Sequence, residues 1–257
     1  MKTRILDRHH VGRIVREVGR DGLMDEMVAA LTEAILQLDE RQTVVRARDG
    51  FQYSRPDVGL VEWMPVLADG EDVTIKVVGY HPTNPAQRSL PTIVATVSVY
   101  DTRTGHLAGL VDGTFLTALR TGAASAVASR VLAKPDASTL GLVGCGAQAV
   151  TQLHAMARTF DLERVLIHDL DRAAVDTFPD RVAGLLPAGV SVEAAPLADV
   201  LAASDIVCTQ TSIPAGEGPL FERAEVRPWL HVNAVGSDLP GKVELPRSLL
   251  TAAFVCP

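Results

Sequence analysis

The sequence has little cysteine, and its cysteines do not form a metal-binding pattern. Cys145, Cys208 and Cys256 are far apart, and no C-x-x-C pair occurs. This excludes the common structural zinc motifs and is typical of proteins from a reducing compartment. Cys145 has no obvious base beside it in the sequence, so we interpret it as a small residue within a turn rather than as a nucleophile. We therefore expect no bound metal.

Long hydrophobic runs and clusters of basic residues are also absent. No segment approaches the roughly 18 uninterrupted apolar residues of a membrane span, and Met1–His10 has scattered charges but no apolar core of a secretory signal. The formal net charge of −7 and the lack of a Lys/Arg run argue against a nucleic-acid surface. We expect a cytoplasmic protein that binds neither membranes nor nucleic acids.

A glycine-rich turn between an apolar strand and an apolar helix is present in Thr139–Val150 (TLGLVGCGAQAV). Gly144 allows the tight turn, Gly146 lets the backbone approach a pyrophosphate, and Ala149 fills the third small-residue position, where helix and strand pack closely. The helix that begins near Ala147 offers free N–H groups and a partial positive charge to an anion. The pattern predicts a dinucleotide-binding turn, and an ordinary glycine-rich turn of an α/β domain is the alternative.

A carboxylate at the end of the next strand favours NAD as the ligand. A buried strand is predicted at Arg164–His168 (RVLIH), and Asp169 follows it, 23 residues beyond Gly146. A carboxylate at this place suits a ribose with free 2′- and 3′-hydroxyls, so NAD is favoured over NADP. Arg172 lies three residues later and keeps NADP open as the alternative.

The segment before residue 115 is predicted to consist mostly of strands. An amphipathic helix is expected at Asp21–Leu38, followed by a strand at Thr43–Phe51 that runs into a turn at Asp49-Gly50. This strand carries Arg46 and Arg48, and arginines on alternate residues of a strand point to the same side. Two such guanidiniums suit carboxylate recognition, and a solvated sheet face is an equally good explanation.

Two charged residues stand inside apolar strands. Glu62 lies in Leu60–Leu67 and Lys76 lies in Val73–Gly79, and a charge in such a strand is unfavourable unless it is paired or reaches water. Both are therefore candidate functional residues. For Lys76 the alternative is an edge strand that leaves its side chain in solvent.

The rest of the chain is predicted to form a hairpin, a long helix and then alternating strands and helices. The hairpin joins Leu90–Asp101 to His106–Val111, and the long helix covers Thr114–Leu132, with Thr117 as its N-cap. Further helices are expected near Arg172–Leu186 and Pro196–Ala203, and further strands near Val190–Ala194 and at Asp205–Thr209, Trp229–Ala234 and Ala252–Val255.

Strands that alternate with helices imply a parallel sheet with right-handed crossovers, and ligands collect at the carboxyl ends of such strands. Thr211, Asn233 and Asp238 fall at these ends. The sequence therefore predicts an α/β protein whose second half binds a small ligand at one edge of its sheet.

Four separate stretches resemble the ornithine cyclodeaminase/mu-crystallin family. They are VTIKVVGYHPTNP, VDGTFLTALRTGAASAVAS, LGLVGCGAQAVTQLHA and VNAVGSDLPGKVELP, and the resemblance runs from about residue 40 to the last residue. It implies an α+β substrate-binding and dimerisation domain at 1–115, a Rossmann NAD-binding domain at 116–257, and an active site in the cleft between them. It also implies a homodimer that takes a small-molecule amino-acid substrate.

The resemblance further implies roles for individual residues. Lys76 and Asp238 correspond to the catalytic lysine and to the acid that takes the proton of the side-chain amine. Arg120 corresponds to an arginine that binds the substrate carboxylate, and Arg48 is our choice for a second one, with Arg46 close enough to leave the register open. The expected substrate-binding set is Arg48, Glu62, Met64 and Arg120. The expected cofactor-binding set is Thr121, Gly144, Gly146, Ala147, Gln148, Asp169, Thr211 and Val235.

The activity that the resemblance implies is conversion of L-ornithine to L-proline and ammonia through an imine, with NAD recycled. Two guanidiniums can hold a carboxylate in a fixed orientation, and Glu62 resembles the acid that contacts the substrate amine. Asp238 can accept a proton from an ammonium, so that the amine becomes a nucleophile. The family also contains lysine cyclodeaminases. An NAD(P)-dependent amino-acid dehydrogenase or ketimine reductase is the alternative, and a non-catalytic mu-crystallin-like binding protein is another.

Members of this family usually continue for several tens of residues beyond the position of Pro257. The resemblance thus implies a Rossmann domain truncated at its C-terminal end. A fragment and a natural short form are both open at this point.

Overall fold

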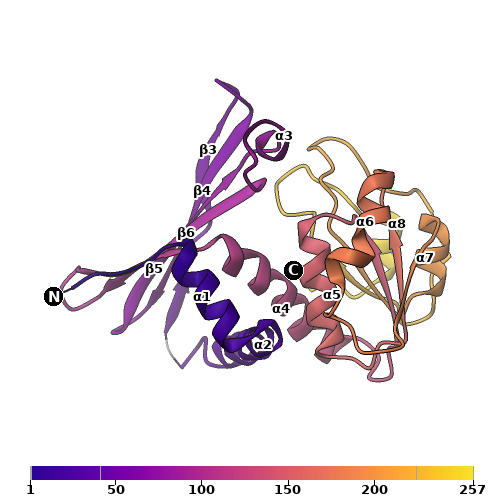
Figure 1. Ribbon diagram of the computed structural model, residues 1–257, viewed down its shortest axis with the longest axis horizontal. Coiled ribbons are helices and arrows are strands. Elements are labelled where there is room, and N and C mark those ends of the chain that lie inside the picture. Colours follow the sequence, from indigo (N-terminus) through magenta and orange to yellow (C-terminus); the bar gives the residue numbers. More distant parts are fainter. Residues whose placement is uncertain (1, 41, 224, 257) are drawn as a thin grey trace. The chain divides into compact units, whose positions relative to one another are not determined.

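The computed structural model describes residues 2–40, 42–223 and 225–256, and it contains two compact units (Figure 1). Unit 1 consists of Met1–Leu23 and Ala29–Ala118, and unit 2 consists of Met24–Val28 and Leu119–Pro257. We propose that these units correspond to the domains expected at 1–115 and 116–257.

Unit 1 is built on one mixed sheet. Its strands are β1 (Arg4–Leu6), β2 (Thr43–Val45), β3 (Asp49–Tyr53), β4 (Gly59–Ala68), β5 (Asp72–Tyr80), β6 (Ile93–Asp101) and β7 (Leu107–Asp112). The order is β1-β7-β6-β5-β4-β2, and β3 also pairs with β4. β1 runs parallel to β7, and the other described pairs are antiparallel. The β4–β5 hairpin turns at Gly70, whose φ of 78° favours glycine.

Helices lie between the strands of this sheet in the chain. They are α1 (Arg8–Val18), α2 (Arg20–Leu36), which contributes Met24–Val28 to unit 2, and α3 (Asn84–Arg88). The prediction of a helix at Asp21–Leu38 is confirmed within two residues at each end. The Asp7 carboxylate accepts a hydrogen bond from the His10 N–H and caps the start of α1, a helix that the sequence patterns did not predict.

The region Thr43–Phe51 differs from its prediction. β2 ends at Val45, so Arg46 and Arg48 lie in a connection rather than on one face of a strand. Asp49-Gly50 is not a turn but the start of β3, where Gly50 pairs with Glu62. A Cβ at Gly50 would lie 2.4 Å from the Val61 carbonyl oxygen. The glycine is therefore needed for close approach of two strands, not for a reversal of the chain.

Unit 2 holds a five-stranded parallel sheet in the middle of a layered α/β fold (Figure 1). Its strands are β8 (Thr139–Val143), β9 (Arg164–His168), β10 (Ser191–Ala194), β11 (Ile206–Thr209) and β12 (His231–Ala234), and its helices are α4 (Thr114–Leu132), which starts in unit 1, α5 (Ala147–Ala157), α6 (Arg172–Val182), α7 (Leu197–Ala203) and α8 (Arg247–Ala252). The order is β10-β9-β8-β11-β12. The predicted α/β class with a Rossmann-type unit is confirmed.

The core of unit 2 explains why its strands could be predicted. Leu140, Leu142, Leu166, Ile167 and Ile206 are at most 1% exposed. Parallel strands are covered by helices on both faces, so they form continuous apolar runs instead of alternating patterns. Burial of each such side chain contributes on the order of 2 kcal/mol.

Three details of this half were predicted wrongly. Thr117 is not the N-cap of α4, because the helix begins at Thr114, whose N–H donates to the Asp112 carboxylate at 2.9 Å. α6 ends at Val182, four residues before the predicted end, and Gly184 follows with a φ of 79°. The run Ala252–Val255 is not a strand. α8 ends at Ala252, and residues 253–255 are exposed, without a neighbouring strand among the described residues.

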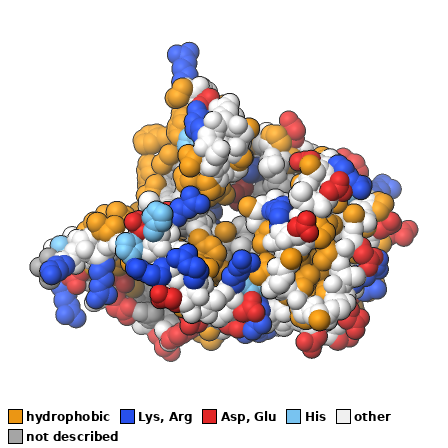
Figure 2. Space-filling model, viewed as in Figure 1, with side chains coloured by type: hydrophobic (Ala, Val, Ile, Leu, Met, Phe, Trp, Pro, Cys, Tyr) orange, Lys and Arg blue, Asp and Glu red, His pale blue; other side chains and the backbone are white. Residues whose placement is uncertain are grey.

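The surface carries mixed charges. Figure 2 shows acidic and basic side chains interspersed over the visible face of unit 2, and hydrophobic side chains gathered over the part of unit 1 that holds β3 and β4. None of the described helices has the length and apolar character needed to cross a membrane. Within the described residues, no group of three His, Cys, Asp or Glu side chains could hold a metal ion.

Candidate active site

The glycine-rich turn of unit 2 has the geometry that a dinucleotide needs. Gly144 has a φ of 95°, and a Cβ there would lie 2.9 Å from the Gln210 carbonyl oxygen. At Gly146 a Cβ would meet no atom within 4 Å, so this position borders open space. Gly146 is also the N-cap of α5, and no side chain caps this helix start. Ala147 is exposed and Ala149 is fully buried. The free N–H groups of α5 are thus available to an anion.

Asp169 lies beside this turn, as expected from the sequence. One carboxylate oxygen accepts a hydrogen bond from the Cys145 N–H at 2.6 Å, and the other accepts one from the Asp171 N–H at 2.8 Å. A cavity of about 310 Å³ adjoins it, lined by Ile167, His168, Asp169, Arg172, Val175 and Ala194–Pro196. A carboxylate can accept hydrogen bonds from a ribose diol, and the cavity holds both the Asp169 carboxylate and the Arg172 cation.

Arg181 is a residue of this turn that the sequence patterns did not indicate. It lies on α6, and its guanidinium donates to the Cys145 carbonyl at 2.6 Å and to the Gly146 carbonyl at 2.8 Å. Two carbonyl oxygens bound by one rigid fork hold the turn in a fixed shape. No local sequence signal marks Arg181, because Cys145 and Gly146 lie 36 and 35 positions before it in the chain.

The two buried thiols, Cys145 and Cys208, are unsuited to nucleophilic chemistry. Burial, reinforced by the charge of Asp169, raises the pKa of the Cys145 thiol to about 11. Burial raises the pKa of the Cys208 thiol to about 12. Both groups are therefore protonated at neutral pH, and this supports the interpretation of Cys145 as a small residue of the turn.

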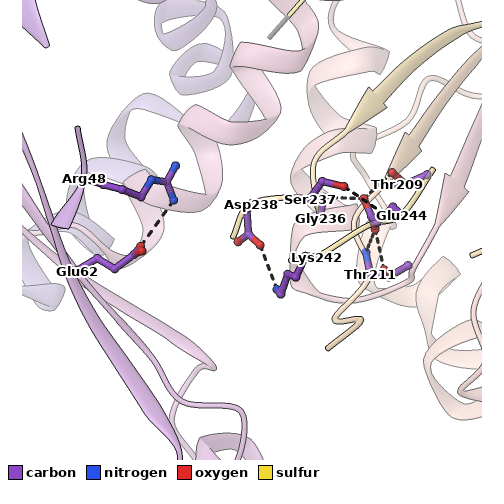
Figure 3. A network of polar contacts seen from close by, with 9 residues as sticks. All are labelled: Arg48, Glu62, Thr209, Thr211, Gly236, Ser237, Asp238, Lys242 and Glu244. Carbon is purple, nitrogen blue, oxygen red and sulfur yellow. Dashed lines mark hydrogen bonds and ion pairs between the residues drawn. The ribbon is translucent and has the colours of Figure 1, made fainter. Parts of the chain in front are cut away.

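Four predicted substrate-site residues come together on unit 1. Met64 lies directly opposite Lys76 in the β4–β5 pair, and Glu62 is two residues from Met64 on β4, so these three side chains share one face of the sheet. The buried Glu62 forms an ion pair of 3.7 Å with Arg48, which reaches it from the β2–β3 connection (Figure 3).

The structure decides the alternative raised for Lys76 and distinguishes the surroundings of Arg46 and Arg48. β5 lies between β4 and β6, so Lys76 is on a central strand and the edge-strand explanation is wrong. Of the two arginines near residue 47, Arg48 is the one with an ion pair to Glu62 among the described contacts, whereas the Arg46 backbone N–H donates to the Pro65 carbonyl.

The remaining predicted residues lie on unit 2, at the carboxyl ends of β11 and β12 and on α4 and α5. Asp238 follows β12 and is 54% exposed in its side chain, and the almost buried Lys242 contacts its carboxylate at 3.0 Å (Figure 3). The Val235 N–H donates to the Thr209 carbonyl at 2.8 Å.

The α4 residues are Arg120, which is exposed, and the half-buried Thr121. Gln148 on α5 donates to the Thr151 hydroxyl at 2.6 Å, and Asn233 donates to the Ser129 hydroxyl at 2.9 Å.

Glu244 is a second residue that the sequence patterns did not single out. It is fully buried, and its carboxylate accepts hydrogen bonds from Thr209, Thr211 and Gly236 (Figure 3). The signal that pointed to Glu62, an isolated acid in an apolar run, is also present in VELP around Glu244. The same argument could therefore have found it.

A family model covers almost the whole chain. The model of the ornithine cyclodeaminase/mu-crystallin family matches residues 8–256. The chain belongs to this family. The resemblance inferred from four sequence stretches is thereby confirmed.

Relatives within the family differ in the reactions for which they are named. The chain is 43% identical to the L-lysine cyclodeaminase of Streptomyces rapamycinicus, over 100% of this chain and 74% of that protein. A solved lysine cyclodeaminase structure, which addresses recognition of L-lysine, L-ornithine and L-2,4-diaminobutyric acid, is 49% identical with a TM-score of 0.93, over 99% of this chain and 73% of that one. An archaeal alanine dehydrogenase dimer with bound NAD is 30% identical with a TM-score of 0.84, over 98% and 73%.

Proposed function

We propose that this member of the ornithine cyclodeaminase/mu-crystallin family is an NAD-dependent cyclodeaminase of L-α,ω-diamino acids, an ammonia-lyase. L-Ornithine, which would give L-proline and ammonia, is the substrate implied by the sequence motifs. L-Lysine is the second candidate, because the chain is 43% identical to an L-lysine cyclodeaminase. The observation that carries the proposal is the grouping of Glu62, Met64 and Lys76 on one sheet face, with Arg48 paired to Glu62.

The residues of unit 2 fit NAD. Open space beside Gly146, the uncapped start of α5 and the oriented carboxylate of Asp169 provide a pyrophosphate site and a ribose acceptor. We assign Gly144, Gly146, Ala147 and Gln148 to the pyrophosphate end. Thr121, Thr211 and Val235 are assigned to the rest of the cofactor. When bound, NAD supplies the hydride chemistry that no amino-acid side chain can perform.

The proposed work of the protein side chains is to bind the substrate and to move protons. Arg48 and Arg120 each bind the substrate carboxylate through charge-assisted hydrogen bonds. Glu62 contacts the α-amine, and Lys76 lies beside the reacting Cα. Asp238 accepts a proton from the side-chain ammonium. The free amine can then attack the oxidised Cα and displace ammonia.

Turnover without net consumption of NAD is the test of this proposal. The protein is incubated with L-ornithine, or with L-lysine in a parallel reaction, and NAD⁺ at about a tenth of the substrate concentration. We expect ammonia and a cyclic imino acid, proline or its six-membered homologue, in excess of the NAD⁺ supplied. Mass spectrometry measures both products. If neither L-ornithine nor L-lysine gives a cyclic product, the cyclodeaminase assignment is wrong.

A variant at Asp238 tests the residue assignment. Asp238→Asn cannot accept the proton, so turnover should fall by at least about 100-fold, the usual range for loss of a general base. The affinity for NADH should stay within about twofold of the wild type. Unchanged formation of the cyclic product would contradict the role given to Asp238.

A stoichiometric amino-acid dehydrogenase is the second candidate function, favoured by the similarity to the archaeal alanine dehydrogenase. The same reactions distinguish the two. A dehydrogenase accumulates NADH in proportion to the amino acid oxidised, whereas a cyclodeaminase returns the hydride and leaves the absorbance of NADH nearly unchanged.

A further inference from the structure

The carboxylate of Glu244 joins the ends of two neighbouring strands of unit 2. Its Oε1 accepts hydrogen bonds from the Thr211 N–H at 2.8 Å and the Thr211 hydroxyl at 2.7 Å. Its Oε2 accepts from the Thr209 hydroxyl at 2.7 Å and the Gly236 N–H at 2.9 Å. Thr209 and Thr211 lie at the end of β11, and Gly236 follows β12 (Figure 3). One side chain therefore sets the spacing of two loops.

The carboxylate of Glu244 is fully enclosed, and each of its acceptor positions has a donor. Glu244 is 0% exposed, and a Cβ at Gly236 would lie 2.3 Å from its Oε1. An ionised carboxylate only accepts hydrogen bonds, through about four lone-pair positions, and here four donors occupy them. Each oxygen binds one backbone N–H, which cannot rotate away, and one hydroxyl, which can.

We propose that Glu244 is a positioning residue that fixes the loops carrying Thr211, Val235 and Asp238 and thereby sets the affinity for NAD. This inference rests on the proposed function, because it takes these three residues as cofactor and catalytic groups. Val235 and Gly236 are held further by hydrogen bonds from their N–H groups to the Thr209 carbonyl, at 2.8 and 3.0 Å. The loop from Val235 to Asp238 is thus attached to β11 at the point where Glu244 binds.

The variant Glu244→Gln keeps the volume of the side chain but replaces one of the two acceptor oxygens with an NH₂ donor. Whichever way the amide is oriented, its NH₂ group faces a backbone N–H, of Thr211 or of Gly236, that cannot turn away. Loss of one hydrogen bond to a charged group corresponds to about tenfold or more in an equilibrium constant. We expect the dissociation constant of NADH, measured by fluorescence titration, to rise by at least about tenfold.

Asp205→Asn is the matched control. Asp205 is also a nearly buried carboxylate that ties chain segments of the same sheet. It accepts from the Ser138 and Thr139 N–H groups at 3.2 and 3.1 Å and from Arg227 at 2.6 Å, at the amino end of β11. We expect this variant to lower the melting temperature but to leave NADH affinity within about twofold of wild type. A merely structural role for Glu244 predicts the opposite, that affinity follows stability in both variants.

A second variant, Thr209→Val, removes one donor to Oε2 without touching a proposed ligand residue. It should weaken NADH binding in the same direction, by about two- to tenfold, and keeps the test available if Glu244→Gln does not fold. The inference is wrong if NADH binds the folded Glu244→Gln or Thr209→Val protein as tightly as wild type, or if Asp205→Asn weakens binding equally. A wild-type protein that binds NADH but turns over no diamino acid would refute the proposed reaction alone. One that does not bind NADH would refute both.

Discussion

At the scale of single residues, Asp205 links stability to pH. Burial alone would raise the pKa of its carboxyl, but the N–H groups of Thr139 and Ser138 and the Arg227 guanidinium outweigh burial and hold the pKa below its ordinary value. A carboxyl whose pKa is depressed in the folded state contributes stability above the unfolded pKa, about 3.9, and this contribution is lost as pH falls through the lower folded value.

Asp205→Asn should therefore be less sensitive to acid than the wild type, although less stable at pH 7. We expect the difference in unfolding free energy between the two proteins to be constant from pH 7 to about 5 and to shrink below pH 4. Urea unfolding at pH 7, 5, 4 and 3 measures it. A difference that stays constant down to pH 3 would show that the Asp205 pKa is not depressed.

Single residues also show where prediction from sequence succeeds. Glu62 and Lys76 could be selected because a charge inside an apolar run is unfavourable unless the fold provides for it. Asp169 could be selected from its spacing to Gly146. Arg181 could not, since its role depends on the packing of α6 against a turn, which no local pattern records. The sequence favoured Arg48 over Arg46 but left the register open, and in the structure Arg48 forms an ion pair with Glu62.

At the scale of elements, the small residues of α4 allow a close contact with α5. A Cβ at Gly122 would lie 2.3 Å from the Thr151 carbonyl oxygen. Replacing a helical glycine with alanine normally stabilises a helix by about 1 kcal/mol or less. At Gly122 the steric conflict should make the substitution destabilising instead, because overpacking a tight contact costs about 1–3 kcal/mol.

Gly122→Ala is thus expected to lower the free energy of unfolding by about 1–2 kcal/mol. Gly12→Ala, on α1, is the control. Its Cβ would have as nearest neighbour only the flexible end of Arg16 at 3.6 Å, so this variant should be as stable as the wild type or slightly more so. Urea unfolding of both variants measures the difference. Equal effects would mean that α4 and α5 can separate without loss.

Elements were predictable where one signal dominated. β8, β9 and β11 are continuous apolar runs bounded by turns, and the predicted limits of β9 and β11 agree within one residue. The prediction for Thr43–Phe51 was wrong because a glycine such as Gly50 is compatible with either a turn or a close contact between strands. Only the pairing with β4 distinguishes the two. Ala252–Val255 failed because an apolar run forms a strand only beside a partner.

At the scale of the whole molecule, unit 1 leaves apolar side chains exposed on and beside its outer strands. Val45, Phe51 and Val58 are 66%, 70% and 55% exposed, and β2 is the last strand of the sheet order. Apolar side chains near a sheet edge invite pairing with another chain. The family resemblance implies a homodimer, and from these exposed side chains we predict that it would form through unit 1.

Light scattering after size-exclusion chromatography should give a mass twice that of one chain for the wild type. Phe51→Glu places a charge in the exposed apolar group and should shift the protein to monomers at micromolar concentration, because an unpaired charge in an interface is strongly unfavourable. Leu170→Glu is the control, since Leu170 is 96% exposed on unit 2, and this variant should remain dimeric. A monomeric wild type would refute the dimer. A dimeric Phe51→Glu variant would place the interface elsewhere on the molecule.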